Sequence, residues 1–231
     1  MPTSTNLLRR AGLAFLGLGA VATALAFTFT LGGTGLPIKW PPGPIPVTVM
    51  LGDTTTLSDG SNYNTSARTA AGIWNGQLGS AQLQVTFATG TAHEDNNLNE
   101  VCFAANIFGR SFGDGVLAVT TGASRGNERT EADIIFNNSR TWDSYRGNLR
   151  QGAVDLQRVA IHELGHLLGL DHPDEKGQSV NAITNSHTAT STPWSATTSR
   201  APSPCTARPG CRPTMLSPAP GIFRSPAHPP R

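Results

Sequence analysis

Residues 162–172 read HELGHLLGLDH, and no other stretch of the chain restricts its fold as strongly. Two histidines four residues apart project from one side of an α-helix, about one turn from each other. Gly169 follows three residues after the second histidine, where a residue in the left-handed conformation ends a helix at little steric cost. The pattern therefore predicts a helix that begins after Asp155, ends at Gly169 and buries an apolar stripe of Leu156, Val159, Ala160, Leu164 and Leu167.

Three histidines of this stretch, His162, His166 and His172, have the spacing of one metal site. Imidazole is a preferred zinc ligand, and three protein ligands leave the fourth tetrahedral position free for water or substrate. Glu163 is placed to act as general base on that water and then to protonate a leaving amine. A bare HExxH pattern also occurs as a surface pair on ordinary helices, but the glycine and the third histidine favour the metal site.

The first 26 residues have the order of an export signal. Arg9 and Arg10 supply a positive start, residues 11–26 are apolar, and Ala24-Leu25-Ala26 is a small-x-small cleavage site. We therefore expect cleavage of residues 1–26 and a secreted protein. The alternative is an uncleaved signal that anchors the chain in a membrane. If the signal is cleaved, we expect no stable membrane partner.

Residues 27–43 are predicted to be a linker that ends in a proline-rich run, and residues 44–187 to be a single domain. Hydrophobic periodicity within this domain predicts an alternation of strands and helices. The expected elements are a strand at 45–51, a helix at 64–78 ended by Gly79, a strand at 82–87, a long loop at 90–113, and strands at 116–121 and 132–136 on either side of a turn at 122–129.

Charge and cysteine content exclude two other classes of protein. The formal net charge is only +2, and the arginines after Glu175 are scattered among prolines, so no nucleic-acid partner is expected. The three cysteines are an odd number, which gives no complete disulfide framework.

We expect the protein to be a monomer.

With these residues in view, the stretch at 162–172 resembles the extended zinc motif of the metzincins, and its Gly-Leu-Asp-His ending is most similar to the matrixin branch of bacterial type. Residues 45–51, the helix that contains Trp74, the strand at 132–137 and Trp142 also fall where matrixin catalytic domains have comparable elements. The resemblance implies an α+β fold of the zincin type, with a twisted mixed β-sheet packed against the active-site helix. It also implies zinc-dependent endopeptidase activity on protein or peptide substrates, which would pair with the edge strand at 116–121.

The resemblance implies further metal sites as well, because matrixins often carry calcium or a second zinc. His93, Glu94 and Asp95 are the residues that could hold such an ion. A solvated polar loop is the simpler interpretation, since no second ligand cluster with matching spacing is present in the sequence.

Two features depart from the family pattern. Thr184 stands where matrixins place a methionine beneath the zinc ligands, and a shorter polar side chain there is expected to leave a gap. Residues 188–231 hold many prolines and no acidic residue, so we expect a disordered tail instead of the family's final helix. A displaced reading frame of 193–207 can encode a plausible helix, which suggests a frameshift near Thr188. The alternative function is therefore a secreted zinc-binding protein without catalytic activity.

Overall fold

A computed structural model describes residues 28–178, 182–186 and 222–224. Its centre is a six-stranded mixed sheet in the order β10-β5-β6-β4-β2-β3. The strands are β2 (Gly43–Met50), β3 (Ala81–Phe87), β4 (Glu100–Ala104), β5 (Val116–Arg125), β6 (Glu128–Asn137) and β10 (Ile222–Arg224). β3, β2, β4 and β6 are parallel, whereas β5 and β10 run antiparallel to their neighbours.

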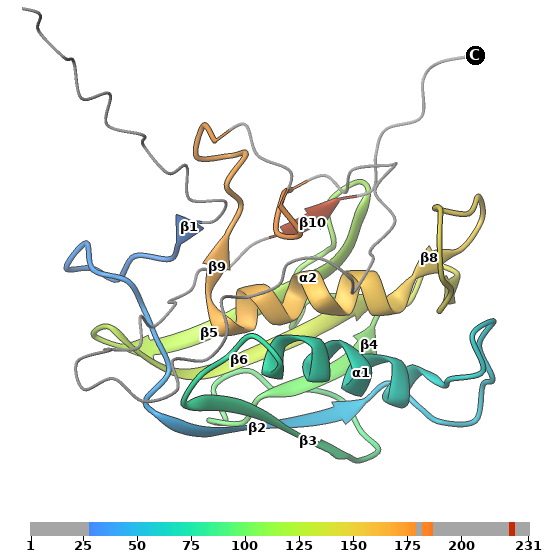
Figure 1. Cartoon of the computed structure of the whole chain (residues 1–231), viewed down its shortest axis with the longest axis horizontal. Helices are drawn as coiled ribbons and strands as arrows, with labels where there is room; N and C mark the ends of the chain where they lie inside the picture. Colours follow the sequence, from blue (N-terminus) through green and yellow to red (C-terminus); the bar gives the residue numbers. More distant parts are fainter. Residues whose placement is uncertain (1–27, 179–181, 187–221, 225–231) are drawn as a thin grey trace, which may run out of the picture.

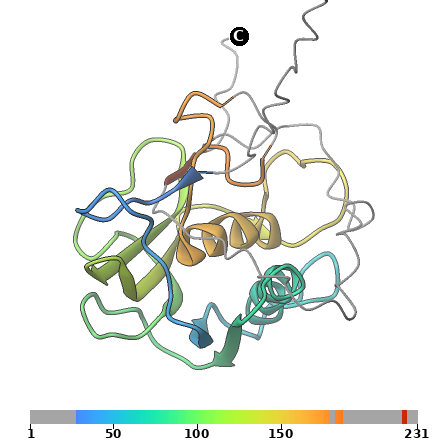
Figure 2. The same ribbon diagram turned by 60° about the vertical axis from the view of Figure 1, so that its left-hand side comes forward.

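Two helices, α1 (Tyr63–Asn75) and α2 (Leu156–Leu168), lie side by side on one face of this sheet (Figures 1 and 2). Short pairs complete the fold: β1 (Thr28–Phe29) with β9 (Leu170–Asp171), and β7 (Trp142–Asp143) with β8 (Val154–Asp155). This is the α+β arrangement expected from the sequence. Within the described residues, no helix has the length and apolar character that crossing a membrane requires.

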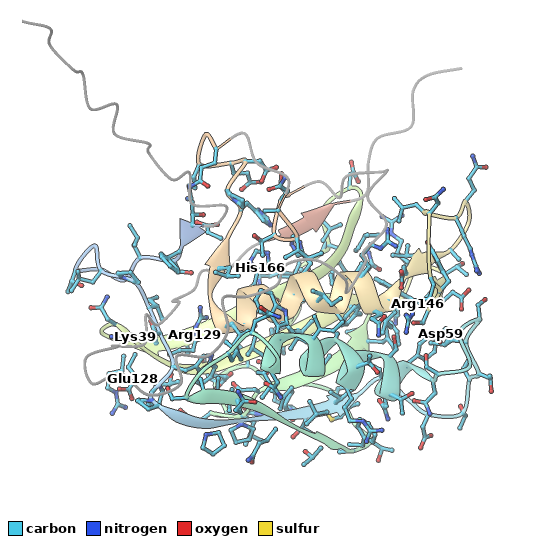
Figure 3. The ribbon with its side chains drawn as sticks, in the orientation of Figure 1. Lys39, Asp59, Glu128, Arg129, Arg146 and His166 are labelled. Carbon is cyan, nitrogen blue, oxygen red and sulfur yellow. The ribbon has the colours of Figure 1, made fainter. Side chains whose placement is uncertain are left out.

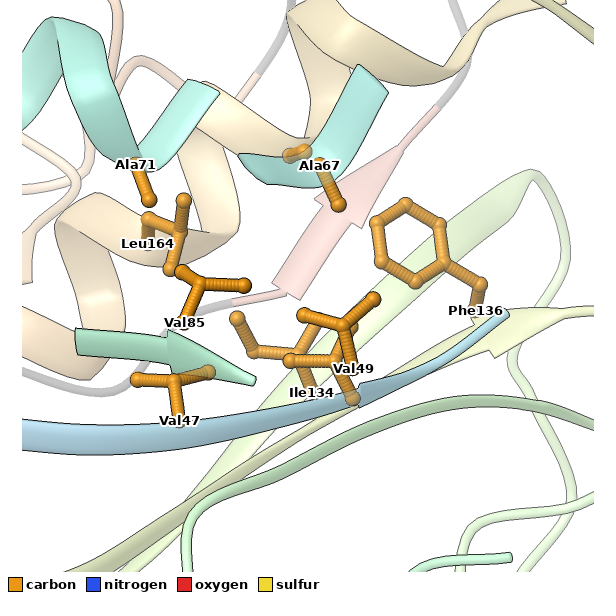
Figure 4. Close-up of a pocket in the computed structure, with 10 residues that line it drawn as sticks. Val47, Val49, Ala67, Ala71, Val85, Ile134, Phe136 and Leu164 are labelled. Carbon is orange, nitrogen blue, oxygen red and sulfur yellow. The ribbon is translucent and has the colours of Figure 1, made fainter. Parts of the chain in front are cut away.

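The hydrophobic core fills the space between the helices and the sheet. Figure 4 shows its centre, where a small apolar gap lies among side chains of both helices and the sheet, including Ala67, Ala71, Leu164, Val47, Val49 and Ile134. Because α2 contributes one face to this core, its remaining polar side chains are fixed relative to the sheet. The gap itself has no polar lining residue and is not the functional site.

α1 begins with a reciprocal cap but ends earlier than the sequence predicted. The side chain of Asn62 accepts a hydrogen bond from the backbone of Thr65, whose hydroxyl accepts one from the backbone of Asn62. The helix ends at Asn75 instead of residue 78. The Asn75 side chain both donates to and accepts from the backbone of Leu83, at 2.9 and 2.8 Å, which turns the chain into β3.

Two further sequence expectations need correction in the middle of the chain. The long loop expected at 90–113 contains a central strand, β4, which is parallel to both β2 and β6. The turn expected at 122–129 is narrower, because β5 and β6 continue to Arg125 and Glu128 across a β-bulge at Ala123 and Ser124. Pairing with neighbouring strands determines the conformation of both segments.

Residues 28–43, expected as part of a linker, are folded onto the domain. The backbone of Lys39 donates to the Asn127 carbonyl at 2.9 Å, and Ile38 is buried. The indole of Trp40 donates to the carbonyl of Leu167 at 2.9 Å. This bond satisfies one of the carbonyls that the last turn of α2 leaves without a helical partner. The structure describes only Ile222–Arg224 of the tail expected to be disordered, and these residues form β10 against β5.

Candidate metal centre

α2 presents two of the three candidate ligands from one face and ends where the sequence predicted. Gly169 adopts φ +94°, the left-handed conformation, and its amide donates to the carbonyl of Gly165 at 2.8 Å. The chain then reverses into β9, which leads directly to His172. Asp155 stands at the helix start as expected, but its carboxylate does not bond the helix amides and lies 3.4 Å from the guanidinium of Arg158.

The three imidazoles meet at one point inside the protein. His162 and His166 have no exposed surface, and His172 is 1% exposed. The Nε2 atom of His166 (Figure 3) lies 2.9 Å from that of His162 and 3.1 Å from that of His172. The third separation, between His172 and His162, is 3.4 Å. Ligands of a tetrahedral zinc with ordinary Zn–N bonds are separated by about 3.3 Å, so the arrangement fits this ion.

The other ring nitrogen of each histidine faces an oxygen. Nδ1 of His162 lies 2.8 Å from the carbonyl of Ile183, and Nδ1 of His166 lies 2.7 Å from that of Leu170. Nδ1 of His172 is 3.2 Å from a carboxylate oxygen of Glu175. Because these oxygens accept hydrogen bonds, each Nδ1 carries the proton and each Nε2 keeps a lone pair for a metal.

Electrostatics also favour the ligand state of the rings. Burial lowers the pKa of His162 well below its ordinary value, and the neighbouring His166 and His172 lower it further. A neutral imidazole at physiological pH can donate its lone pair to a cation. We refer to His162, His166 and His172 below as the histidine triad. In the described part of the chain it is the only group of three His, Cys, Asp or Glu side chains whose ligand atoms converge.

Glu163 is fully buried next to the histidine triad, and its two carboxylate oxygens have different surroundings. Oε2 accepts a hydrogen bond of 2.6 Å from the hydroxyl of Thr120 on β5. Oε1 is buried and has no hydrogen-bond partner among the described residues. Burial raises the pKa of Glu163 to about 8, against the lowering effect of the Thr120 hydrogen bond. Such a group is suited to hold a proton at neutral pH and to exchange it with a bound molecule.

Residues 182–186 pass beneath the triad. Besides the Ile183 carbonyl that fixes His162, this segment contributes Thr184, which is 1% exposed. A Cβ atom added to Gly165 would lie 2.9 Å from the Thr184 methyl and 3.1 Å from the ring of Trp74. The methyl group therefore packs against the backbone of α2, and the expected gap is filled at this point. Ser186 secures the segment by donating to the carboxylate of Asp174.

The residues considered for a second metal do not come together. The His93 side chain is 72% exposed, and Glu94 forms an ion pair of 2.7 Å with Arg110. The backbone amide of Asp95 donates to the carboxylate of Glu131. The aromatic residue Trp142 is buried against Phe136 in the core. Cys205, Cys211, His187 and His228 lie outside the described residues.

Sequence reasoning assigned no role to Thr120. The expected strand at 116–121 was interpreted only as a backbone edge for substrate. The available signal was a hydroxyl directly after four apolar residues, which are buried in the structure as Thr120 is. A buried hydroxyl needs a partner, and the partner here is Glu163.

Comparison with known protein families adds one match. The sequence profile of the Peptidase_M10 family, described as Matrixin, matches residues 44–193, which is more than half of the chain. The match includes α2, the histidine triad and the segment around Thr184. None of the curated protein sequences compared with the chain matches it.

Proposed function

Because this chain belongs to the matrixin family of zinc metalloendopeptidases, we propose that His162, His166 and His172 bind its catalytic Zn²⁺ and that Glu163 is its general base. The observation that carries this assignment is the convergence of three buried Nε2 atoms whose Nδ1 partners are all oxygen acceptors. Structural zinc has four protein ligands, whereas the described residues bring three together, as hydrolytic zinc requires.

When bound, zinc supplies a Lewis acid that acidifies water and polarises the scissile carbonyl. The protein's own contribution is proton transfer at Glu163. Its Oε1 atom, which has no protein partner among the described residues, takes a proton from the attacking water. The same atom then delivers the proton to the nitrogen of the leaving amine.

We propose that extended protein substrates bind along β5. In the structure one side of β5 is paired with β6 and the other with β10. Another strand can pair only on the side that carries β10, so a substrate that pairs with Val116, Ala118 and Val119 must replace Ile222–Arg224. Support for this location comes from Thr120, which joins the middle of β5 to the carboxylate of Glu163.

The protein's location and assembly also remain proposals. We propose a secreted monomer, on the basis of the export signal at residues 1–26, with a membrane-anchored form as the alternative. Sequencing the mature N-terminus of the native protein separates these, because an intact residue 1–26 segment would support the anchor. Calcium binding is a prediction for which the described residues provide no converging ligand group.

The second candidate function is zinc binding without catalysis, favoured by one observation, the threonine at position 184. Zinc content and casein hydrolysis, measured on the same preparation, separate the two functions. We expect one zinc per chain and hydrolysis that a chelator abolishes. Stoichiometric zinc without turnover would support the silent form, and a metal-free protein under zinc-replete conditions would contradict both.

The role of Glu163 is tested by Glu163→Ala, with Glu128→Gln as the matched control. Glu128 is an exposed glutamate on β6 away from the triad. We expect Glu163→Ala to retain zinc and to lower kcat by about 10²- to 10⁴-fold, the usual contribution of a general base. The control should keep full activity. Equal kcat values for Glu163→Ala and the wild type would remove Glu163 from the mechanism.

A further inference from the structure

The hydroxyl of Thr120 is buried at a position that an apolar side chain would also fill. Thr120 is 3% exposed and follows Val116, Leu117, Ala118 and Val119, four buried apolar residues of β5. A valine would fill the same volume without burying a polar group. The hydroxyl is nevertheless satisfied, because it lies 2.6 Å from Oε2 of Glu163 and 3.1 Å from the Glu163 carbonyl oxygen.

The shorter of these two contacts fixes the carboxylate from the sheet. The backbone of Glu163 is held by α2, while its side chain is held by a residue of a different element, β5. Among the described residues, Thr120 is the one side chain that hydrogen-bonds this carboxylate. The bond uses Oε2 and leaves Oε1 without a protein partner, so the two oxygens are distinguished before any substrate binds.

We propose that Thr120 is a positioning residue for catalysis: its hydroxyl holds Oε2 of Glu163 so that Oε1 faces the reacting water. This inference rests on the proposed function of Glu163. Misplacement of a catalytic group by about 1 Å can reduce the rate by about 10²-fold. The hydroxyl does not contact a candidate metal ligand, so its loss should affect turnover and not zinc affinity.

The position of Thr120 also links the base to the substrate strand. The residue preceding it, Val119, pairs with Ile222 of β10, and the residue before that, Ala118, pairs with Phe223. A peptide that took the place of β10 would therefore lie along the backbone that carries the Thr120 hydroxyl. In this arrangement one strand fixes both the main chain of the substrate and the carboxylate that acts on it.

Three variants test the proposal. Thr120→Val removes the hydroxyl at nearly constant volume, and Thr120→Ser restores a hydroxyl without the methyl group. Thr130→Val is the matched control, because Thr130 is a partly buried threonine of β6, outside the strand proposed to bind substrate. For each variant, kcat, KM, zinc stoichiometry and Tm are measured together with Glu163→Ala in the same assay.

We expect Thr120→Val to lower kcat by about 10- to 100-fold, to change KM by less than about twofold and to retain one zinc per chain. Thr120→Ser should recover kcat to within about threefold of the wild type, and Thr130→Val should match the wild type. A purely structural role would instead lower Tm or zinc content in proportion to activity, and serine would not rescue it. That pattern, or an unchanged kcat in Thr120→Val, overturns the proposal.

Crystal structures of the zinc-loaded wild type and Thr120→Val provide a readout that does not depend on turnover. We expect one orientation of the Glu163 carboxylate in the wild type and a displaced or divided orientation in the valine variant. An inactive wild type that still shows this difference would refute the proposed peptidase function but not the positioning contact. An identical carboxylate in both structures would overturn the contact whatever the activity.

Discussion

The protein buries two groups of ionisable side chains, and they are built in opposite ways. The histidine triad points inward, with Nε2 atoms 2.9 to 3.4 Å apart. The second group, which we call the acidic cluster, consists of Glu100, Glu131 and Asp133 on β4 and β6, all less than a tenth exposed. Its carboxylates accept hydrogen bonds from backbone amides, including those of His93, Asp95 and Glu100.

The difference teaches that burial alone does not mark a metal site. In the acidic cluster each carboxylate accepts a hydrogen bond from a backbone amide, and Glu131 in this way holds a loop whose residues Asp95 and Asn97 have positive φ angles of 62° and 60°. In the histidine triad the Nδ1 atoms face oxygen atoms, whereas the three Nε2 atoms converge on one point. Convergence of ligand atoms is therefore the informative observation.

The largest expected effect is on zinc binding. His166→Ala should lower zinc affinity by at least about 100-fold and abolish casein hydrolysis, because two ligands cannot hold a catalytic zinc. Glu131→Gln, an equally buried change in the acidic cluster, should leave zinc stoichiometry at one per chain. Calorimetric titration with zinc measures both. Loss of zinc in Glu131→Gln would break the distinction between the two groups.

The acidic cluster should instead affect how the free energy of unfolding depends on pH. Burial, with the nearby charges of Glu131 and Glu100, raises the pKa of Asp133 from 3.8 to about 7. Between these values the folded state keeps a proton that the unfolded state releases, so the free energy of unfolding falls as pH rises from about 4 to about 7. Asp133→Asn removes this loss.

We expect Asp133→Asn to be more stable than the wild type at pH 8, by about 1 to 4 kcal/mol, and similar to it at pH 4. Urea unfolding at the two pH values checks this. Zinc content should not change in the variant. A stability difference of the same size at both pH values would show that Asp133 does not titrate as proposed.

A smaller effect is expected from crowding the backbone beneath the histidine triad. Gly165→Ala places a methyl group 2.9 Å from the Thr184 methyl and 3.1 Å from Trp74, so something must move. We expect a loss of stability of about 1 to 3 kcal/mol, with weaker zinc binding. Gly72→Ala on α1 is the control: a Cβ there meets nothing within 4 Å, and the helix should be slightly stabilised. Thermal unfolding with and without zinc compares them; a tolerated Gly165→Ala would mean that the triad's support is adaptable.

The smallest effect concerns the access of substrate to β5. Removing β10 should change peptide binding next to the triad and leave the acidic cluster unchanged. A chain that stops after Pro220 lacks β10, so β5 is open to an extended peptide. We expect KM for a peptide substrate to fall by about two- to tenfold at unchanged kcat, since no strand has to be displaced. A chain that stops after Arg224 keeps β10 and should resemble the full chain. Equal KM values for all three would place substrate elsewhere.

The histidine triad could be predicted from the sequence because its geometry is local. A separation of four residues on a helix and a glycine that ends the helix determine where two rings lie and how the third returns. β4 could not be predicted in the same way, since Glu100–Ala104 is a strand only through its parallel partners β2 and β6. The packing of residues 28–43 on α2 likewise depends on contacts with residues far away in sequence.

Thr120 illustrates the same limit within the functional site. Its strand was expected and its burial is typical of a core position, but its partner Glu163 lies 43 residues away. A hydroxyl in a buried strand indicates that some partner exists without saying which one. The short strand β10 was also outside the reach of local patterns, because the composition of residues 188–231 is typical of disordered segments.

Two indole rings, from segments that precede and include α1, donate hydrogen bonds to α2. Trp40 donates to the carbonyl of Leu167 at 2.9 Å and Trp74 to that of Ile161 at 2.8 Å, and the Trp74 ring also lies beside Gly165 between the two helical histidines. A divalent charge arriving at those histidines changes the electric field at both chromophores. The intrinsic tryptophan fluorescence of the native protein is therefore expected to report metal binding, without labels, dyes or substrate.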